Sequence, residues 1–237
     1  VYAATQWGIL VLLARVGNPE AVGQYGLGLA IAAPVMLFFS LQLRAVQATD
    51  ARIEFQFRDY AGVRIVMTVM ASFILAGVGA ALYQDGMAIT VSAFALSKGI
   101  ESMSDVVYGL WQQQERMELI AKSLVLRGVL ALTAAALCFA AYHTVWITVC
   151  GMAAAWAVVF TAYDLRHAIA VARETHQTVM PRFSMLQMKR LLRLALPLGI
   201  VTMLLSFNAN VPRYTISHFR SMRELGIFSA LSYIPVT

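Results

Sequence analysis

The chain alternates between long uncharged apolar runs and short polar segments along its whole length. A helix that crosses about 30 Å of hydrocarbon needs roughly 20 mostly apolar residues. The runs at 21–43 and 65–84 meet this length directly, and the run at 194–212 nearly does. Because lipid offers the backbone no hydrogen-bond partner, each run is predicted to be a transmembrane helix.

The longest uncharged run, residues 128–163, is too long for one crossing. As a single helix it would be about 54 Å long, so it is predicted to fold back as two spans that turn near residues 142–144. Residues 1–14 are typical of the remainder of a first span. Residues 86–110 form a span that carries charges, and residues 225–237 begin an eighth span.

These spans predict an all-α integral membrane protein, with a six-helix transmembrane lobe and the first one or two helices of a second lobe. We assign residues 1–172 to the first lobe, whose first span is truncated, 173–193 to a cytoplasmic linker, and 194–237 to the truncated second lobe. In the linker, apolar and basic side chains separate on residues 185–193, which favours either an amphipathic interfacial helix or a plain extension of span seven. Both ends of the chain lie inside apolar runs, so we expect a fragment of a longer protein.

Basic residues are distributed unevenly over the loops. Thirteen Lys and Arg residues lie in or beside the loops after spans two, four and six, and four lie on the opposite side. The positive-inside rule therefore places the even loops and the N-terminus in the cytoplasm. With 60% hydrophobic and 13% charged residues, the composition excludes a soluble enzyme. The net charge of +6 reflects the basic residues of these loops and does not indicate a nucleic-acid partner.

Three ionisable residues, Lys98, Glu101 and Asp105, lie within the fourth span. Near the bilayer centre each costs at least about 2.5 to 3.5 kcal/mol on insertion scales, so they need a protein or water environment. On a helix Lys98 and Asp105 are about 20° apart in projection, and Glu101 is roughly 60° away. Lys98 and Glu101 are spaced to pair, whereas Asp105 has no cation on its own helix. The stripe is interpreted as one wall of a hydrophilic cavity, the alternative being a satisfied network buried against other helices.

Other polar residues near the ends of spans are weaker candidates. Arg44 and Arg127, at the inner ends of spans two and five, could capture an anionic headgroup or simply anchor the topology. Asn208 and Arg213 of span seven could contact a ligand on release or bond neighbouring helices. Trp111 is predicted to lie in an interfacial aromatic belt.

Two segments of the chain resemble each other. Residues 23–31 and 226–234 share a glycine, an aromatic residue, a small residue and an isoleucine at an offset of 203 positions. Both begin an even-numbered span, so they indicate parallel repeats about an axis along the membrane normal. Chance similarity between two apolar helices is the alternative.

Four segments carry a resemblance to a known family. They are VGQYGLGLAIAAPV at 22–35, LLRLALPLGIV at 191–201, NANVPRYTI at 208–216 and LGIFSALSYI at 225–234. They resemble bacterial polysaccharide-biosynthesis and O-antigen flippases of the multidrug/oligosaccharidyl-lipid/polysaccharide exporter superfamily. The resemblance implies a transporter, not an enzyme, that flips an undecaprenyl-diphosphate-linked oligosaccharide across the bacterial inner membrane by alternating access, for O-antigen or capsular/exopolysaccharide biosynthesis.

The expected partners are the lipid-linked oligosaccharide, membrane lipids, H⁺ or Na⁺ as coupling ion, and a glycan polymerase with other assembly proteins. No cofactor, metal or nucleic acid is expected. The alternatives are a cation-coupled multidrug exporter of the same superfamily, a membrane-embedded glycan polymerase or acyltransferase, and a structural scaffold.

Overall fold

The computed structural model describes residues 2–50 and 54–232, and within these ranges every regular element is helical. The helices are α1 (Tyr2–Val16), α2 (Pro19–Ser40), α3 (Leu43–Thr49), α4 (Phe57–Leu82), α5 (Asp85–Gln113), α6 (Met117–Tyr142), α7 (Val145–Val159), the π-helical turn η1 (Phe160–Asp164), α8 (Leu165–Glu174), α9 (Met185–Phe219) and α10 (Met222–Ser232). The predicted all-α fold is confirmed. The last residues of the predicted eighth span, 233–237, lie outside the described residues, as does the loop charge Arg52.

Five helical segments of the described chain are long and apolar enough to cross a membrane, which confirms a multi-pass membrane protein. The 128–163 run folds back as predicted. His143, in the left-handed region at φ 49°, ends α6, and its backbone N–H donates to Phe139 O at 2.9 Å. Large apolar side chains such as Phe73 (75% exposed) and Leu137 (67% exposed) stay uncovered, an arrangement that suits lipid rather than water.

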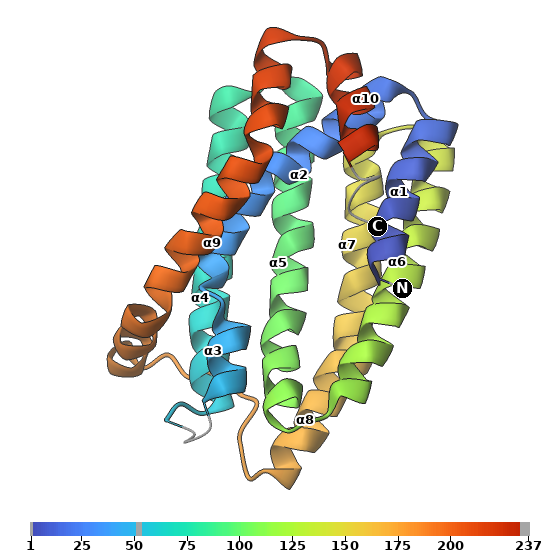
Figure 1. Ribbon diagram of the computed structural model, residues 1–237. Helices are drawn as coiled ribbons and strands as arrows, with labels where there is room; N and C mark the ends of the chain where they lie inside the picture. Colours follow the sequence, from blue (N-terminus) through green and yellow to red (C-terminus); the bar gives the residue numbers. More distant parts are fainter. Residues whose placement is uncertain (1, 51–53, 233–237) are drawn as a thin grey trace.

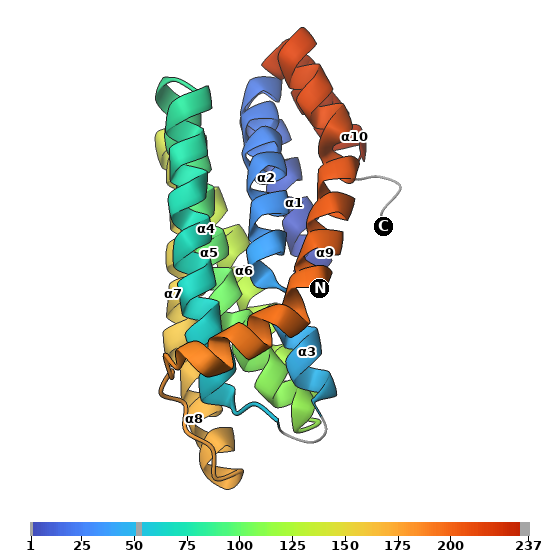
Figure 2. The same ribbon diagram turned by 90° about the vertical axis from the view of Figure 1, so that its left-hand side faces the viewer.

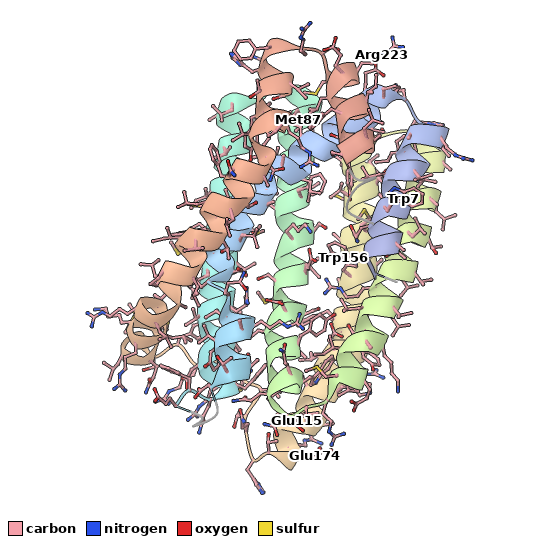
Figure 3. The ribbon with its side chains drawn as sticks, in the orientation of Figure 1. Trp7, Met87, Glu115, Trp156, Glu174 and Arg223 are labelled. Carbon is pink, nitrogen blue, oxygen red and sulfur yellow. The ribbon has the colours of Figure 1, made fainter. Side chains whose placement is uncertain are left out.

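The helices run up and down between two ends of the bundle (Figure 1). The connections after α3, α5 and α8 lie at one end, and those after α1, α4, α6 and α9 lie at the other. In Figure 3, Glu115 and Glu174 mark the first end, and Arg223 marks the second. The predicted separation of the even and odd loops is therefore present in the fold.

Two apolar cores fill the bundle, one around Phe94 and Trp156 and the other around Tyr60 and Trp111. The prediction that Trp111 lies in an interfacial belt is wrong. Its side chain is 0% exposed, and its ring centroid lies 5.7 Å from that of Tyr108. The neighbouring glutamines suggested an interface, but helix packing from several directions covers the indole.

Helix α2 contains Pro34, which has no N–H to bond the carbonyl of Ala30 one turn earlier. The hydroxyl of Tyr214, on α9, donates to that carbonyl at 2.5 Å. A side chain from a neighbouring helix thus satisfies the backbone group that the proline leaves free, as the lipid environment requires. This bond also ties α9 to the middle of α2.

Residues 185–193 form the first turns of α9 and not a separate helix. Figure 2 shows these turns strongly inclined to the rest of α9, which contains Pro197. Pro197 removes the hydrogen bond to the carbonyl of Arg193, so a change of direction is expected there. The amphipathic segment and span seven are therefore continuous in the chain.

The described parts of the two similar segments, 23–31 and 226–232, lie against each other, because α10 packs on the first half of α2 and both helices start at the same end (Figure 1). Gly23 and Gly226 meet at the crossing. A methyl group on Gly226 would overlap the carbonyl oxygen of Pro19, and one on Gly23 would overlap that of Met222. Glycine at both positions is what allows the two backbones to approach so closely.

Candidate functional site

The three ionisable residues of α5 share one face, as predicted, and line a single cavity of about 640 Å³. The cavity lies between α2, α3, α4 and α5. Its lining residues are Leu29, Ala33, Met36, Leu37, Ser40, Gln42, Arg44, Ala45, Arg64, Lys98, Glu101, Ser102, Asp105 and Gln112. One wall is apolar and comes from α2, and the opposite wall is polar and comes mostly from α5.

Lys98 and Glu101 form the ion pair that their spacing predicts. Lys98 Nζ lies 2.7 Å from Glu101 Oε2, and the two side chains are 24% and 28% exposed. The ammonium group also lies 5.7 Å from the ring centroid of Trp156 on α7, where the face of the indole attracts a cation. The pair is therefore partly accessible at the cavity wall and is not sealed in the protein interior.

Asp105 has cationic partners on other helices. Arg64 Nη2 lies 2.9 Å from Asp105 Oδ2, and Arg44 Nη1 lies 3.7 Å from Oδ1. Arg64 also donates to Ser102 Oγ at 3.2 Å. The Arg64 side chain is 1% exposed and that of Asp105 is 34% exposed, so this pair links the protein interior to the cavity.

Sequence reasoning missed the role of Arg64 by counting it among the loop charges. The structure places it within α4, on the same buried face as Phe57 and Tyr60. Two signals could have identified it. The three residues follow helical spacing, and a mid-span carboxylate such as Asp105 requires a cation from a neighbouring helix.

Arg44 completes the polar wall from α3. Its Nε donates to Gln112 Oε1 at 3.1 Å, and its guanidinium lies 5.4 Å from the ring centroid of Tyr108. The lining contains three cationic side chains and two anionic ones, so one positive charge is in excess. The planar guanidinium group of arginine presents paired N–H donors that match phosphate oxygens, which favours an anionic group as the ligand. The apolar wall of α2 suits a ligand that is amphipathic.

The other candidate residues do not join this cavity. Arg127 is 1% exposed inside the bundle, donates to the Tyr108 hydroxyl at 3.3 Å and lies 5.0 Å from the ring centroid of Trp156. This burial inside the bundle does not suit either of the two roles considered for Arg127, capture of an anionic headgroup or anchoring of the topology. Arg213 donates to Asn210 Oδ1 at 2.7 Å and to Ser232 Oγ at 3.2 Å, while Asn208 is exposed on α9.

No group of three His, Cys, Asp or Glu side chains that could hold a metal ion occurs among the described residues. The two cysteines, Cys138 and Cys150, are free thiols, and the structure shows them partly buried.

Comparisons with known proteins place these features in context. The sequence profile of a family described as "Polysaccharide biosynthesis protein" matches residues 3–236. The chain is 24% identical over 228 residues to a "Capsular polysaccharide biosynthesis protein CapF" of Staphylococcus aureus. The matched region covers 96% of this chain and 56% of that relative, so the chain spans little more than half of the relative's length. No solved structure gives a significant match.

Proposed function

Because the chain belongs to the polysaccharide biosynthesis protein family, we propose that it forms part of a transporter that flips a lipid-linked oligosaccharide across the bacterial inner membrane. The glycan is carried on undecaprenyl diphosphate and serves capsule, exopolysaccharide or O-antigen assembly, in keeping with the name of the CapF relative. In this proposal the protein is a carrier and not an enzyme.

The observation that supports this proposal most is the cavity on α5. Arg44 and Lys98, which are partly exposed, can donate charge-assisted hydrogen bonds to a diphosphate, each roughly twice as strong as a neutral one, and the buried Arg64 adds a positive charge behind Asp105. Glu101 and Ser102 can bond sugar hydroxyls from the same wall. An anionic, hydroxyl-rich headgroup therefore matches the polar wall, and the start of a hydrocarbon chain matches the apolar wall of α2.

The arrangement of α2 and α10 supports alternating access. Their glycine crossing joins the two similar segments at the end of the bundle away from the basic loops. We propose that residues 1–172 and 194–237 belong to two parallel-repeat lobes joined by the linker 173–193, and that this crossing closes the outer side of the path. The basic end and the N-terminus then face the cytoplasm.

A multidrug exporter of cationic compounds fits this cavity less well. Such a carrier needs carboxylates available to a cation, whereas Glu101 and Asp105 both contact basic side chains. Proton or sodium coupling and contacts with a glycan polymerase are part of the proposal for the intact protein.

The test is export of surface glycan in a bacterium whose own gene is deleted and replaced by variants of the intact protein. Loss of one hydrogen bond to a charged group costs about 1.5 to 3 kcal/mol, so Lys98→Ala should reduce export about 10-fold or more. Arg173→Ala removes an exposed basic residue at the end of the bundle that carries the basic loops. It is the matched control and should export normally.

Two further measurements make the outcome specific. Immunoblots of membranes should show equal amounts of each variant, and lipid-linked glycan should accumulate in the inner leaflet of the Lys98→Ala strain. Normal export by both Lys98→Ala and Asp105→Ala, at wild-type protein levels, would refute the assignment of the cavity.

A further inference from the structure

Basic side chains gather on one face of the first turns of α9, and they do not line the cavity on α5. Lys189, Arg190 and Arg193 are all exposed there. At about 100° per residue, these three side chains and Leu186 fall within an arc of about 100°. We call this arc the basic face of α9 and define it by Leu186, Lys189, Arg190 and Arg193.

The opposite side of the same turns packs on the protein. Leu191 and Ala195 are 0% exposed and belong to the apolar core around Trp111, and Met188 packs against that core. The apolar side of this amphipathic segment is therefore covered by other helices of the bundle. The side that it turns outward is the basic one.

The chain just before α9 is fixed to the start of α4. The backbone N–H of Arg182 donates to Arg58 O at 2.9 Å. A methyl group on Gly62 would overlap the carbonyl oxygen of Arg182, so the two backbones are in close contact. The basic face is thus held at a defined position relative to α4, although Figure 2 shows it inclined to the rest of α9.

The charges of this face are not neutralised within the described part of the chain. Six ion pairs form among residues 2–50 and 54–232, and none contains a basic residue of this face. Arg190 and Arg193 line a cavity of about 600 Å³ together with Glu54, Phe55 and Leu194. Because two cations and one carboxylate line it, this cavity has one positive charge in excess and favours an anion.

Large apolar side chains border the basic face. Met185 and Leu186 are 74% and 68% exposed, and Phe183, just before the helix, is 59% exposed. The helix continues directly into a span with exposed apolar side chains such as Leu194 (56%) and Leu198 (44%). The basic face therefore lies where the chain enters the hydrocarbon, at the level of lipid headgroups. An acidic protein would match the charges but would not explain the apolar side chains at this level.

We propose that the basic face of α9 and the adjoining cavity bind the headgroup of an anionic phospholipid of the phosphatidylglycerol type, in the leaflet at this end of the bundle. The phosphate accepts hydrogen bonds from Arg190 and Arg193, and Lys189 adds a third positive charge. Glu54 accepts from the glycerol hydroxyls, and the acyl chains contact the apolar border. The occupant is a lipid of the bilayer, so the inference does not depend on what the cavity on α5 binds.

Native mass spectrometry of the intact protein in mild detergent, titrated with phosphatidylglycerol, tests this site. The triple variant Lys189→Gln/Arg190→Gln/Arg193→Gln should bind its first phosphatidylglycerol about 10- to 100-fold more weakly than the wild type. The reason is that each basic residue near an anionic lipid contributes a factor of about 5. Phosphatidylcholine should bind equally well to both proteins.

The matched control is Lys122→Gln/Arg166→Gln/Arg173→Gln. It removes the same number of charges from exposed residues of α6 and α8 at the same end of the bundle and should bind phosphatidylglycerol as the wild type does. Thermal unfolding checks that both triple variants fold, as expected for changes of exposed side chains. If the first does not fold, the single variants Arg190→Gln and Arg193→Gln replace it, each with about 5-fold weaker binding.

A second measurement locates the lipid. Met185→Cys, in a Cys138→Ala/Cys150→Ala background, places a thiol beside the basic face for labelling with bimane. In phosphatidylcholine vesicles that contain a small, equal fraction of either spin-labelled lipid, phosphatidylglycerol should quench the bimane several-fold more than phosphatidylcholine. High salt and the triple variant should both reduce this preference, because the attraction is electrostatic.

Three results would overturn the proposal: an unchanged phosphatidylglycerol affinity in the first triple variant, an equal loss in the control, or equal quenching by the two spin-labelled lipids. Loss of a bound acidic protein with lipid affinity unchanged would assign the face to that protein and would also overturn it. Neither assay uses a glycan, so a negative result leaves the transport function standing, and loss of the transport function would leave lipid binding intact.

Discussion

Neutralising Asp105 is predicted to destabilise the protein more than removing its partner Arg64, although both changes break the same ion pair. Asp105→Asn leaves the Arg64 cation, 1% exposed, opposite a neutral amide. Arg64→Met leaves Asp105, which is 34% exposed and keeps Arg44 at 3.7 Å. The two variants thus differ in which charge is left behind and in how much water it can reach.

The magnitudes follow from this asymmetry. A fully buried charge that loses its partner costs about 3 to 5 kcal/mol. Because Asp105 is partly exposed and Asn still accepts a hydrogen bond, we expect about 2 kcal/mol for Asp105→Asn and about 1 kcal/mol or less for Arg64→Met. At about 2 to 4 °C per kcal/mol for a domain of this size, Asp105→Asn should lower the Tm by about 4 to 8 °C.

The assay is thermal unfolding of the intact protein in mild detergent, followed by tryptophan fluorescence. The double variant Arg64→Met/Asp105→Asn should be more stable than Asp105→Asn alone, because it no longer contains the buried cation. A larger loss of stability in Arg64→Met than in Asp105→Asn, or a double variant less stable than Asp105→Asn, would refute the reasoning.

Two further predictions concern the contacts of α2. Gly226→Ala should lower the Tm by an amount equivalent to about 1 to 3 kcal/mol, because its methyl group would overlap the Pro19 carbonyl at the α2–α10 crossing. Gly77→Ala is the matched control: an added Cβ meets no atom within 4 Å, so this variant should be neutral or up to about 1 kcal/mol more stable, and equal shifts in both would contradict the crossing. Tyr214→Phe should cost about 1 to 3 kcal/mol by leaving the Ala30 carbonyl without its donor. In a Pro34→Ala background the restored N–H reaches that carbonyl, so the same change should cost clearly less, and an equal cost in both backgrounds would count against this role of Tyr214.

The lengths of the apolar runs predicted most of the helices because the backbone in lipid has few alternatives. The fold-back at His143 follows from length alone, and the shared face of Lys98, Glu101 and Asp105 follows from helical periodicity. These are local properties, since each depends only on residues within the same segment.

The errors have one cause, which is that burial depends on neighbouring helices. Trp111 is followed by three glutamines and Arg127 directly precedes the uncharged run 128–163, so both were expected near the end of a span, yet both are covered by packing between helices. The burial of Asp164 could not be predicted from the sequence either. An uninterrupted α-helical repeat points Tyr163 inward, whereas the π-helical turn η1, which is seen only in the folded chain, buries Asp164 instead. The periodicity of one segment does not show which neighbouring helices cover its side chains.

By itself the sequence determined an all-α membrane protein with charged groups along one face of its fourth predicted span. It did so because the hydrocarbon thickness and the helical repeat constrain each segment separately. Only the tertiary structure decided that Asp105 forms ion pairs with Arg64 and Arg44 and that Tyr214 donates to the Ala30 carbonyl. The close contact between Gly23 and Gly226 was likewise decided only by the tertiary structure. Those contacts join residues far apart in the chain, and their distances are set by how whole helices pack, which no local pattern encodes.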